Sequence, residues 1–485
     1  MSMKLIISRL PVGLRHAAAY TGALGVAKII SFIMVPVFTH HLSPADYGRL
    51  DVLQTMADLV SVIVGLSLAD ILFRFAGKDG QSRSSRNTAR VLFGMAIITG
   101  SIFLVLAQIL APSVHAFMPG SIGLMEVRLL LAALSFSAMI LVPLSWFRLT
   151  DRPGHYFVGT AGRAVLQASL AAALLAAGGG IVGVMMAGLI ACITLTLLLG
   201  SLFLKDVGVS FSPRGWSNYA RYGSPLIFSG VAMFFLSSCD RWLLAAFLGP
   251  EVLAPYAVAA KFALMTAVLL QPFEMWWFAR RFAILSESSG EVTVARTAEI
   301  GLVCVVIAIL AIACGGPMLI KIMTPPSYHQ AVVYLPWLAL LVGFRTATNL
   351  VNLGLYSARS PWRVLVIDGV TAFTVICLFL LLIPEFGVWG VVVAGAICLG
   401  GRLLATYKMS QTQRSLRYRP SALLALFAIA IVGTTLIGQA QSDIHRLLLG
   451  TAIIAATVVL AFFLSLLPRS WLSRIRVLRL DLVKG

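Results

Sequence analysis

The chain has 485 residues, of which 59% are hydrophobic and 11% are charged, whereas an average soluble domain is about 45–50% apolar and about 25% charged. This composition and a mean hydropathy of +0.95 exclude both an ordinary soluble protein and a disordered chain, because so much apolar surface cannot stay in water. On a soluble chain the net charge of +19 would suggest a nucleic-acid partner. Here most basic residues lie in short gaps between apolar runs, so the charge indicates membrane topology instead.

Apolar runs of about 20 residues predict an all-α, multi-pass membrane protein with about 14 transmembrane helices. We expect these helices at residues 16–39, 51–73, 91–112, 125–147, 156–177, 181–204, 222–247, 253–279, 297–319, 331–357, 364–384, 387–407, 421–439 and 447–467. The run at 16–39 is long enough to span and is predicted to be an uncleaved first helix.

The distribution of basic residues predicts which side each gap faces. Alternate gaps and the two ends of the chain hold 27 of the 37 Lys and Arg residues, whereas the opposite gaps hold only Arg49, Arg128, Lys321 and Arg446. Since cytoplasmic loops of membrane proteins are rich in Lys and Arg, both termini are predicted to be cytoplasmic.

Motifs for catalysis are missing from the sequence. There is no phosphate-binding loop, dinucleotide fingerprint, G-x-S-x-G elbow or kinase signature, and the six cysteines form no C-x-x-C pair. No gap between spans is long enough for a separate active-site domain. We therefore expect no enzyme, no catalytic residue, no metal and no cofactor.

A weak internal repeat at an offset of 206 residues aligns 42–48 (LSPADYG) with 248–254 (LGPEVLA). It predicts two six-helix lobes, at 1–204 and 205–408, followed by two additional helices at 409–467. The remaining residues, 468–485, form a basic cytoplasmic tail that is either an interfacial segment or a frayed end. Transporters built from repeats bind substrate between the repeats.

Ionisable residues inside predicted spans are costly unless they are paired or face water, so each is a functional candidate. Arg345, Asn349, Asn352 and Tyr356 share one helical face, which lines a wet cavity or forms interhelical hydrogen bonds. The other candidates are Lys28, Asp58, Asp70, Arg163, Asp240, Arg241, Lys261, Glu274, Asp368 and Arg402.

Some of these candidates could have a structural role instead of a role in a substrate site. Lys261 is one candidate partner of Asp240, and such a pair would be either a lock between two helices or part of the site. Arg163 and Arg402 lie near span ends, where they would reach the interface. Among the candidates inside the predicted spans, basic residues slightly outnumber acidic ones. This small excess of positive charge favours an anionic substrate, such as a phosphate-linked lipid.

Two segments carry a resemblance to a known family. Gly25-x-x-Lys28 with Val35-Pro36 and residues 42–48, and Asp240-Arg241-Trp242 with residues 248–251, resemble signatures of Wzx-type polysaccharide flippases. These belong to the multidrug/oligosaccharidyl-lipid/polysaccharide (MOP, MATE-like) exporter superfamily. The resemblance implies a two-lobed transporter that moves undecaprenyl-pyrophosphate-linked oligosaccharides across the bacterial inner membrane by alternating access.

The resemblance also implies roles for individual residues. Lys28, Arg345 and Lys261 or Arg241 would meet the anion, next to Asn349 and Asn352, while Asp58, Asp240 or Asp368 would take part in coupling to a proton or sodium gradient. A glycan polymerase and glycosyltransferases are the implied functional partners, in the pathway of lipopolysaccharide, capsule or exopolysaccharide.

Several other functions remain open from the sequence. A drug or cation antiporter of the same superfamily would need an acidic, aromatic-lined cavity, and a peptidoglycan-precursor flippase would differ only in substrate. A membrane glycan polymerase or glycosyltransferase would share the basic pI and the helix number but would need a larger outer loop, and a structural scaffold is the fourth alternative.

Overall fold

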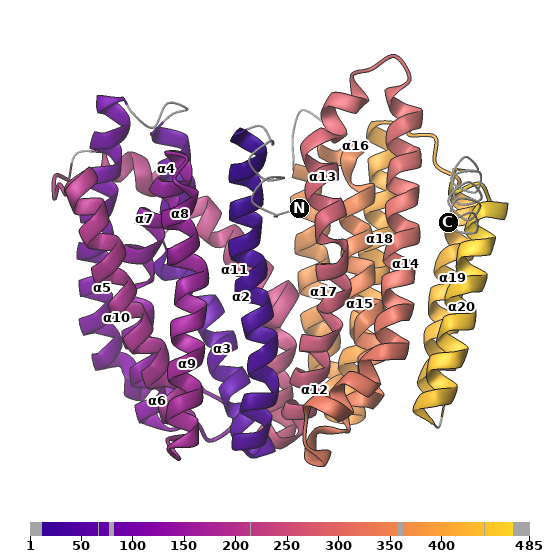
Figure 1. The fold of residues 1–485 in the computed structure, drawn as a ribbon, viewed down its shortest axis with the longest axis horizontal. Coiled ribbons are helices and arrows are strands. Elements are labelled where there is room, and N and C mark those ends of the chain that lie inside the picture. The colour runs from indigo at the N-terminus through magenta and orange to yellow at the C-terminus, as the bar shows by residue number, and fades with distance from the viewer. Residues whose placement is uncertain are drawn as a thin grey trace, which may run out of the picture. The chain divides into compact units, whose positions relative to one another are not determined.

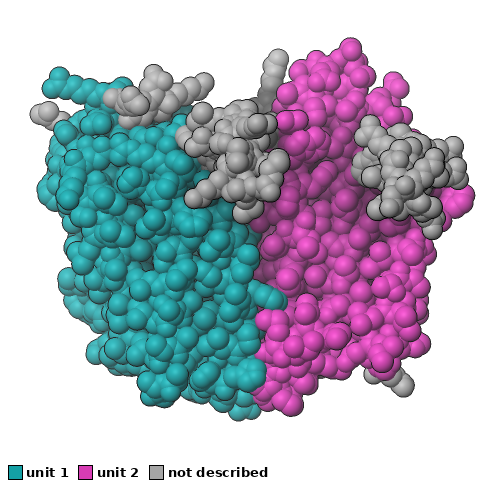
Figure 2. All heavy atoms as spheres, in the orientation of Figure 1, with its two compact units in different colours: residues 1–254 teal, residues 255–485 magenta. Residues whose placement is uncertain are grey.

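The computed structural model describes residues 12–65, 67–76, 82–213, 215–356, 362–440 and 442–468. Within these ranges the chain is helical and contains no strand. Among the described residues, thirteen helical segments are long and apolar enough to cross a membrane, and a bent pair, Trp216–Phe235 and Ser238–Leu248, makes a fourteenth when counted as one span. The predicted fold class is therefore confirmed. The chain forms two compact units, residues 1–254 and 255–485 (Figure 2).

The core of the first unit is formed by α4, α5, α6, α7 and α10, which pack together (Figure 1). Aromatic rings fill its centre, where the Phe203 ring centroid lies 4.7 Å from that of Phe93 and 6.3 Å from that of Trp146. The helices of this unit are α2 (Val12–His41), α3 (Pro44–Val64), α4 (Leu68–Phe75), α5 (Arg83–Phe117), α6 (Leu124–Ser135), α7 (Ser137–Leu149), α8 (Pro153–Phe157), the π-helical turn η1 (Val158–Gly162), α9 (Arg163–Ala176), α10 (Gly180–Asp206) and α11 (Trp216–Leu248).

An ion cluster closes one end of this core. Asp206, the last residue of α10, accepts a hydrogen bond from Trp146 Nε1 at 3.0 Å and pairs with Arg152 at 2.9 Å and with Arg86 at 3.6 Å. One carboxylate thus ties α5, α7 and the segment after α7 to the end of α10.

The second unit is built around α14 and α15, its two most deeply buried spans. Apolar side chains of α14, such as Ile309 and Leu310, pack with Leu350 of α15 and Leu426 of α19. The helices are α12 (Pro250–Ala263), which begins at the end of the first unit, then α13 (Met265–Leu285), α14 (Gly290–Met323), the 3₁₀ turn η2 (Pro326–Tyr328), α15 (Ala331–Val351), α16 (Leu353–Tyr356), α17 (Trp362–Phe386), α18 (Val388–Gln413), α19 (Pro420–Gln439) and α20 (Asp443–Phe463).

The last two spans, α19 and α20, pack on α14. Gly450 of α20 lies so close to α14 that a Cβ atom at this position would be 2.2 Å from the Cβ of Cys314. Small residues at such crossings allow membrane helices to approach closely. The loop before α19 is held by the buried Glu299 of α14, whose carboxylate accepts the backbone N–H of Arg419 at 2.7 Å.

The two repeat motifs have the same local structure. Pro44 begins α3 and Pro250 begins α12, each directly after a short turn. A proline suits the first helical position because its missing N–H would be unsatisfied there anyway. However, α11, which the repeat assigns to the second lobe, packs on α3 and α4 within the first unit. The lobe boundaries stay a prediction, and the tail from 469 onward lies outside the described residues.

Candidate functional site

An acid–arginine cluster lies in the first unit, where α11 packs on α3. The Arg241 guanidinium of α11 pairs with the buried Asp51 carboxylate of α3, with Nε and Oδ2 3.5 Å apart. Asp58, two turns further along α3, is exposed and interacts electrostatically with both residues. The cluster therefore holds two carboxylates for one guanidinium, and we call Asp51, Asp58 and Arg241 the acidic cluster.

The sequence pattern predicts part of this cluster. Asp58 is one of the predicted candidates, and Asp51, seven residues before it, lies on the same face of α3. The partner of Arg241 was missed, because periodicity within one helix shows which face is polar but not which helix lies opposite.

A second charged cluster lies in the second unit, on three spans. Arg402 of α18 pairs with Asp368 of α17, with Nε and Oδ1 2.8 Å apart. Arg345 of α15 is exposed and interacts electrostatically with Arg402. Within the described ranges no side chain forms an ion pair or a hydrogen bond with the Arg345 guanidinium. This cationic cluster, made of Arg345, Asp368 and Arg402, therefore has one uncompensated positive charge.

The stripe predicted on the tenth span is interrupted. The helix α15 ends at Val351, and Asn352 stands between α15 and α16, where its backbone carbonyl accepts the N–H groups of Leu355 and Tyr356. Arg345 and Asn349 lie on α15, whereas Asn352 and Tyr356 belong to a different group of side chains. A hydrophobic-periodicity argument cannot detect this break, because the residues after it are again apolar at helical spacing.

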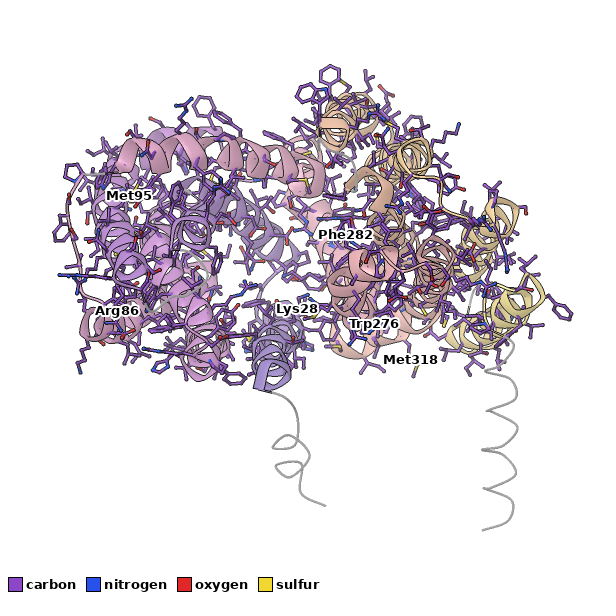
Figure 3. The ribbon with its side chains drawn as sticks, turned by 90° about the horizontal axis from the view of Figure 1, so that it is seen from above. Lys28, Arg86, Met95, Trp276, Phe282 and Met318 are labelled. Carbon is purple, nitrogen blue, oxygen red and sulfur yellow. The ribbon has the colours of Figure 1, made fainter. Side chains whose placement is uncertain are left out.

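Arg281 of α13 holds that second group together. Its Nη1 donates a hydrogen bond to Asn352 Oδ1 at 2.9 Å, and its guanidinium lies 5.5 Å from the Tyr356 ring centroid. The rings of Phe278 and Phe282 lie 4.6 Å and 5.2 Å away. Aromatic faces attract cations, so this environment stabilises the charge without a carboxylate. Figure 3 labels Phe282 on the same helix.

A cavity of about 390 Å³ lies beside this group and is lined by Phe282, Leu285, Ser286, Tyr356 and Arg414. Arg414 pairs with Glu291 at 3.2 Å. Burial raises the pKa of the nearby Tyr418 phenol, so this group is neutral and supplies no negative charge to Arg281. Arg281 lies just beyond the predicted span 253–279 and was therefore not among the predicted site residues, although the aromatic run 276–278 before it is a signal in the sequence.

Three further predicted residues belong to other parts of the fold. Lys28 is exposed on α2 (Figure 3). Asp240 and Lys261 are half-buried, on α11 in the first unit and on α12 in the second, and their pairing stays a prediction.

The structure offers no sign of a metal centre in the part of the chain that it describes: no three His, Cys, Asp or Glu side chains gather there as ligands. All six cysteines are free thiols.

The comparisons with known proteins identify the family. Residues 14–278, more than half of the chain, match the family described as "Polysaccharide biosynthesis protein". The chain therefore belongs to this family, and the predicted resemblance is confirmed. A comparison with curated protein sequences finds no match.

Solved structures of two kinds share the fold. The lipid II flippase MurJ, in an inward closed conformation, is similar with a TM-score of 0.71 and 10% identity over 93% of this chain and 98% of its own. The MATE multidrug transporter DinF-BH, solved in complex with a ligand, is similar with a TM-score of 0.59 and 14% identity over 84% and 96% of the two chains. An inward-facing multidrug resistance MATE family transporter of the MOP superfamily also has a TM-score of 0.59, at 13% identity over 84% and 99%.

Proposed function

We propose that this protein is a flippase that moves undecaprenyl-pyrophosphate-linked oligosaccharide repeat units across the bacterial inner membrane for cell-surface polysaccharide synthesis. Its membership of the polysaccharide biosynthesis family supports the pathway. The observation that carries the proposal is Arg345, a guanidinium inside a span with no counter-ion in the described part of the chain. A charge of this kind is costly in a membrane unless it serves an anionic ligand or faces water.

The chemistry of a pyrophosphate suits the cationic cluster. Guanidinium groups bind phosphate oxygens through paired, charge-assisted hydrogen bonds. Because Asp368 already neutralises Arg402, Arg345 is the group with free donors. Arg345 would contact the pyrophosphate directly, with Asn349 one turn along α15. Lys28, Lys261, Arg241 and Asn352 complete the proposed substrate-binding set.

The acidic cluster supports ion coupling. Asp58 shares Arg241 with Asp51, and a carboxylate that competes for one guanidinium is well suited to take up and release a proton or a sodium ion. Asp58, Asp240 and Asp368 are the proposed coupling residues. The cycle would use alternating access, driven by an ion gradient, without a cofactor and without covalent chemistry.

The proposed orientation places both termini in the cytoplasm, on the side of the gaps that hold most Lys and Arg residues. A glycan polymerase would then receive the flipped units on the outer face, and glycosyltransferases would build them on the inner face. These enzymes are proposed as functional partners only.

The test is to deplete the protein in its native host and to locate lipid-linked glycans in intact spheroplasts with an impermeant glycosidase. Complete repeat units should accumulate on the cytoplasmic leaflet. The wild-type gene should clear them, and an Arg345→Ala variant should not. A Tyr334→Phe variant of the same helix, which removes only one hydroxyl, serves as the control and should restore export. Units that instead accumulate outside would place the block after translocation and contradict the proposal.

A drug or cation antiporter is the second candidate, and the acidic cluster is the observation that favours it, because two carboxylates for one guanidinium suit a cationic ligand. The same depleted cells separate the two functions. Unchanged glycans together with lost resistance to cationic dyes would support the antiporter and not the flippase.

A further inference from the structure

Two adjoining cavities lie at one end of the first unit, apart from both charged clusters. They are formed where the loop between α5 and α6 meets the last turns of α11 and the start of α12. The first has a volume of about 340 Å³ and the second of about 430 Å³, and Gly120 lines both. On the proposed orientation this end faces the outside of the cell.

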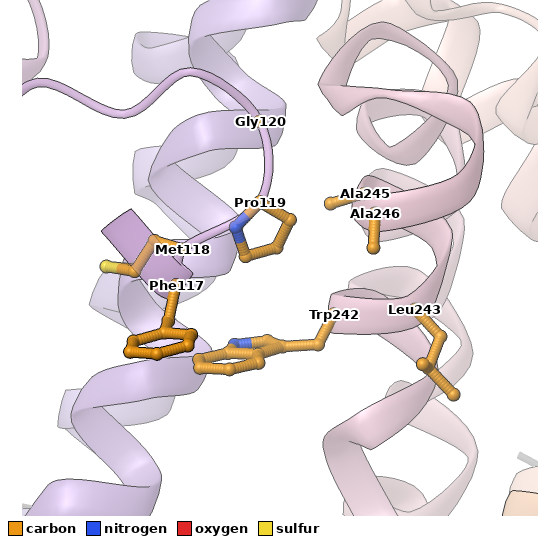
Figure 4. A pocket seen from close by; sticks show the side chains of 8 residues that line it. All are labelled: Phe117, Met118, Pro119, Gly120, Trp242, Leu243, Ala245 and Ala246. Carbon is orange, nitrogen blue, oxygen red and sulfur yellow. The ribbon is translucent and has the colours of Figure 1, made fainter. Parts of the chain in front are cut away.

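The first cavity is apolar and aromatic (Figure 4). Phe117, at the end of α5, is 85% exposed, and the half-buried Trp242 of α11 lines the same cavity. The Trp242 indole N–H has no hydrogen-bond acceptor among the described residues. Because this nitrogen is buried, the ring of Trp242 rather than its N–H is the part that can contact the apolar face of a ligand.

The second cavity has a mixed lining, in which the polar side chains of Arg49, Ser121 and Glu251 stand among apolar ones such as Leu248 and Val252. Glu251 is exposed, and within the described ranges its carboxylate has no partner. Arg49 pairs with Asp46 and donates to the Ser121 carbonyl at 3.3 Å, which leaves further guanidinium donors free.

The charge of this second cavity argues against a phosphate. Asp46 neutralises Arg49, and Glu251 adds a negative charge. An uncharged ligand with several hydroxyl groups fits better, because Glu251 can accept and Arg49 can donate hydrogen bonds.

The walls of the cavities are fixed by close backbone packing. A Cβ atom at Gly48 would lie 1.9 Å from the carbonyl oxygen of Pro250, so the two repeat motifs touch here and only glycine fits. Gly120, at the junction of the cavities, has a φ of +90°, which glycine adopts without strain. A site held this firmly loses little entropy when a ligand binds.

We infer that these two cavities form a carbohydrate site that holds an uncharged sugar ring of the transported glycan at this end of the first unit. The inference rests on the proposed function. Sugar rings have an apolar C–H face, which matches the aromatic wall of the first cavity, and a rim of hydroxyls, which matches the Arg49 and Glu251 side chains of the second. Ligand sites generally combine such an apolar wall with a few placed polar groups.

The test uses the full-length protein in lipid nanodiscs and saturation-transfer NMR with methyl glucoside, galactose and N-acetylglucosamine as probes. At least one sugar should receive saturation from the wild type. Glu251→Gln should weaken its binding about tenfold, since one charge-assisted hydrogen bond is lost, and Trp242→Leu should remove the signal. The matched control is Phe386→Leu, which removes a 61% exposed ring from α17 at the same predicted side of the membrane; it should bind like the wild type.

Three outcomes would overturn the inference. They are the absence of any sugar signal from the wild type, full signals from both site variants, and an equal loss in Phe386→Leu. The last would mean that Phe117 and Trp242 only seat the helix ends in the membrane interface, where aromatic residues gather. This binding test does not depend on transport, so failure of the inference can be distinguished from failure of the proposed function. A wild type that clears lipid-linked glycans but binds no sugar refutes the carbohydrate site alone.

Discussion

At the residue scale, the arginines inside the spans differ in whether another group of the chain neutralises or binds their guanidinium. Arg241 and Arg402 each have an aspartate partner inside a span, and the buried Arg446 donates to the carbonyls of Ile437 and Ala440. These three interactions link helices or hold a helix end, although Arg241 also belongs to the proposed substrate-binding set. Arg345 makes no such contact in the described part of the chain, and this is why we propose that its charge serves a ligand rather than the fold.

This difference predicts opposite effects for two substitutions. Arg345→Gln should abolish glycan export with little change in stability, because no partner is left behind. Arg402→Gln should lower the free energy of unfolding by about 2 kcal/mol, because it leaves the Asp368 carboxylate without its partner. Unfolding of the purified proteins in detergent measures both. The double variant Arg402→Gln/Asp368→Asn should recover part of the loss; equal stability of all three variants would contradict the pairing argument.

Asp58 gives the second prediction at this scale. It is the exposed carboxylate of the acidic cluster, so Asp58→Asn should remove the dependence of transport on an imposed proton or sodium gradient while substrate still binds. Transport into vesicles with and without each gradient measures this. Glu287→Gln, which changes an exposed carboxylate outside the spans, is the control and should keep the dependence. A gradient response that persists in Asp58→Asn would exclude this residue from coupling.

At the scale of helices, the sequence predicts the spans well and their contacts poorly. Span length is set by the thickness of the hydrocarbon layer, so runs such as 421–439 coincide with a helix, Pro420–Gln439. The break at Asn352, the 51° bend in α11 and the pairing of Arg241 with Asp51 depend on neighbouring helices. Residue spacing along one helix contains no information about these neighbours. Arg281 was overlooked for another reason: the predicted span ends at residue 279, whereas α13 extends to Leu285.

The contact between α14 and α20 provides a prediction with a matched control. Gly450→Ala places a methyl group 2.2 Å from the Cβ of Cys314 and should destabilise the protein by about 2 kcal/mol through overpacking. Gly315→Ala, next to Cys314 on α14, meets no atom within 4 Å and should be neutral or slightly stabilising. Thermal unfolding followed by tryptophan fluorescence compares the two. Similar melting temperatures would mean that α20 is not held tightly against α14.

For the whole molecule, the charges at the predicted outer side are mostly neutralised within the chain. Arg49 pairs with Asp46, while Lys321 and Arg446 both pair with Asp443. The predicted inner side holds many more basic residues than acidic ones. The positive-inside rule counts Lys and Arg, and acidic residues contribute little to it, so the proposed orientation rests on the 27 basic residues of the inner gaps and chain ends against four in the outer gaps.

The bend in α11 decides whether this orientation holds for the second half of the chain. If Trp216–Leu248 crosses the membrane, an odd number of spans separates Ser121 from Ser286, and the two lie on opposite sides; if it turns back, they lie on the same side. We expect a crossing, because the gaps after α11 keep the alternation of basic residues. In a cysteine-free background, an impermeant maleimide added to spheroplasts should label Ser121→Cys but not Ser286→Cys. Ser212→Cys, which precedes α11, should be protected under either arrangement and is the control. Labelling of Ser286→Cys would make α11 re-entrant, reverse the sides of every later loop and move the cavity beside Arg281 to the outer face.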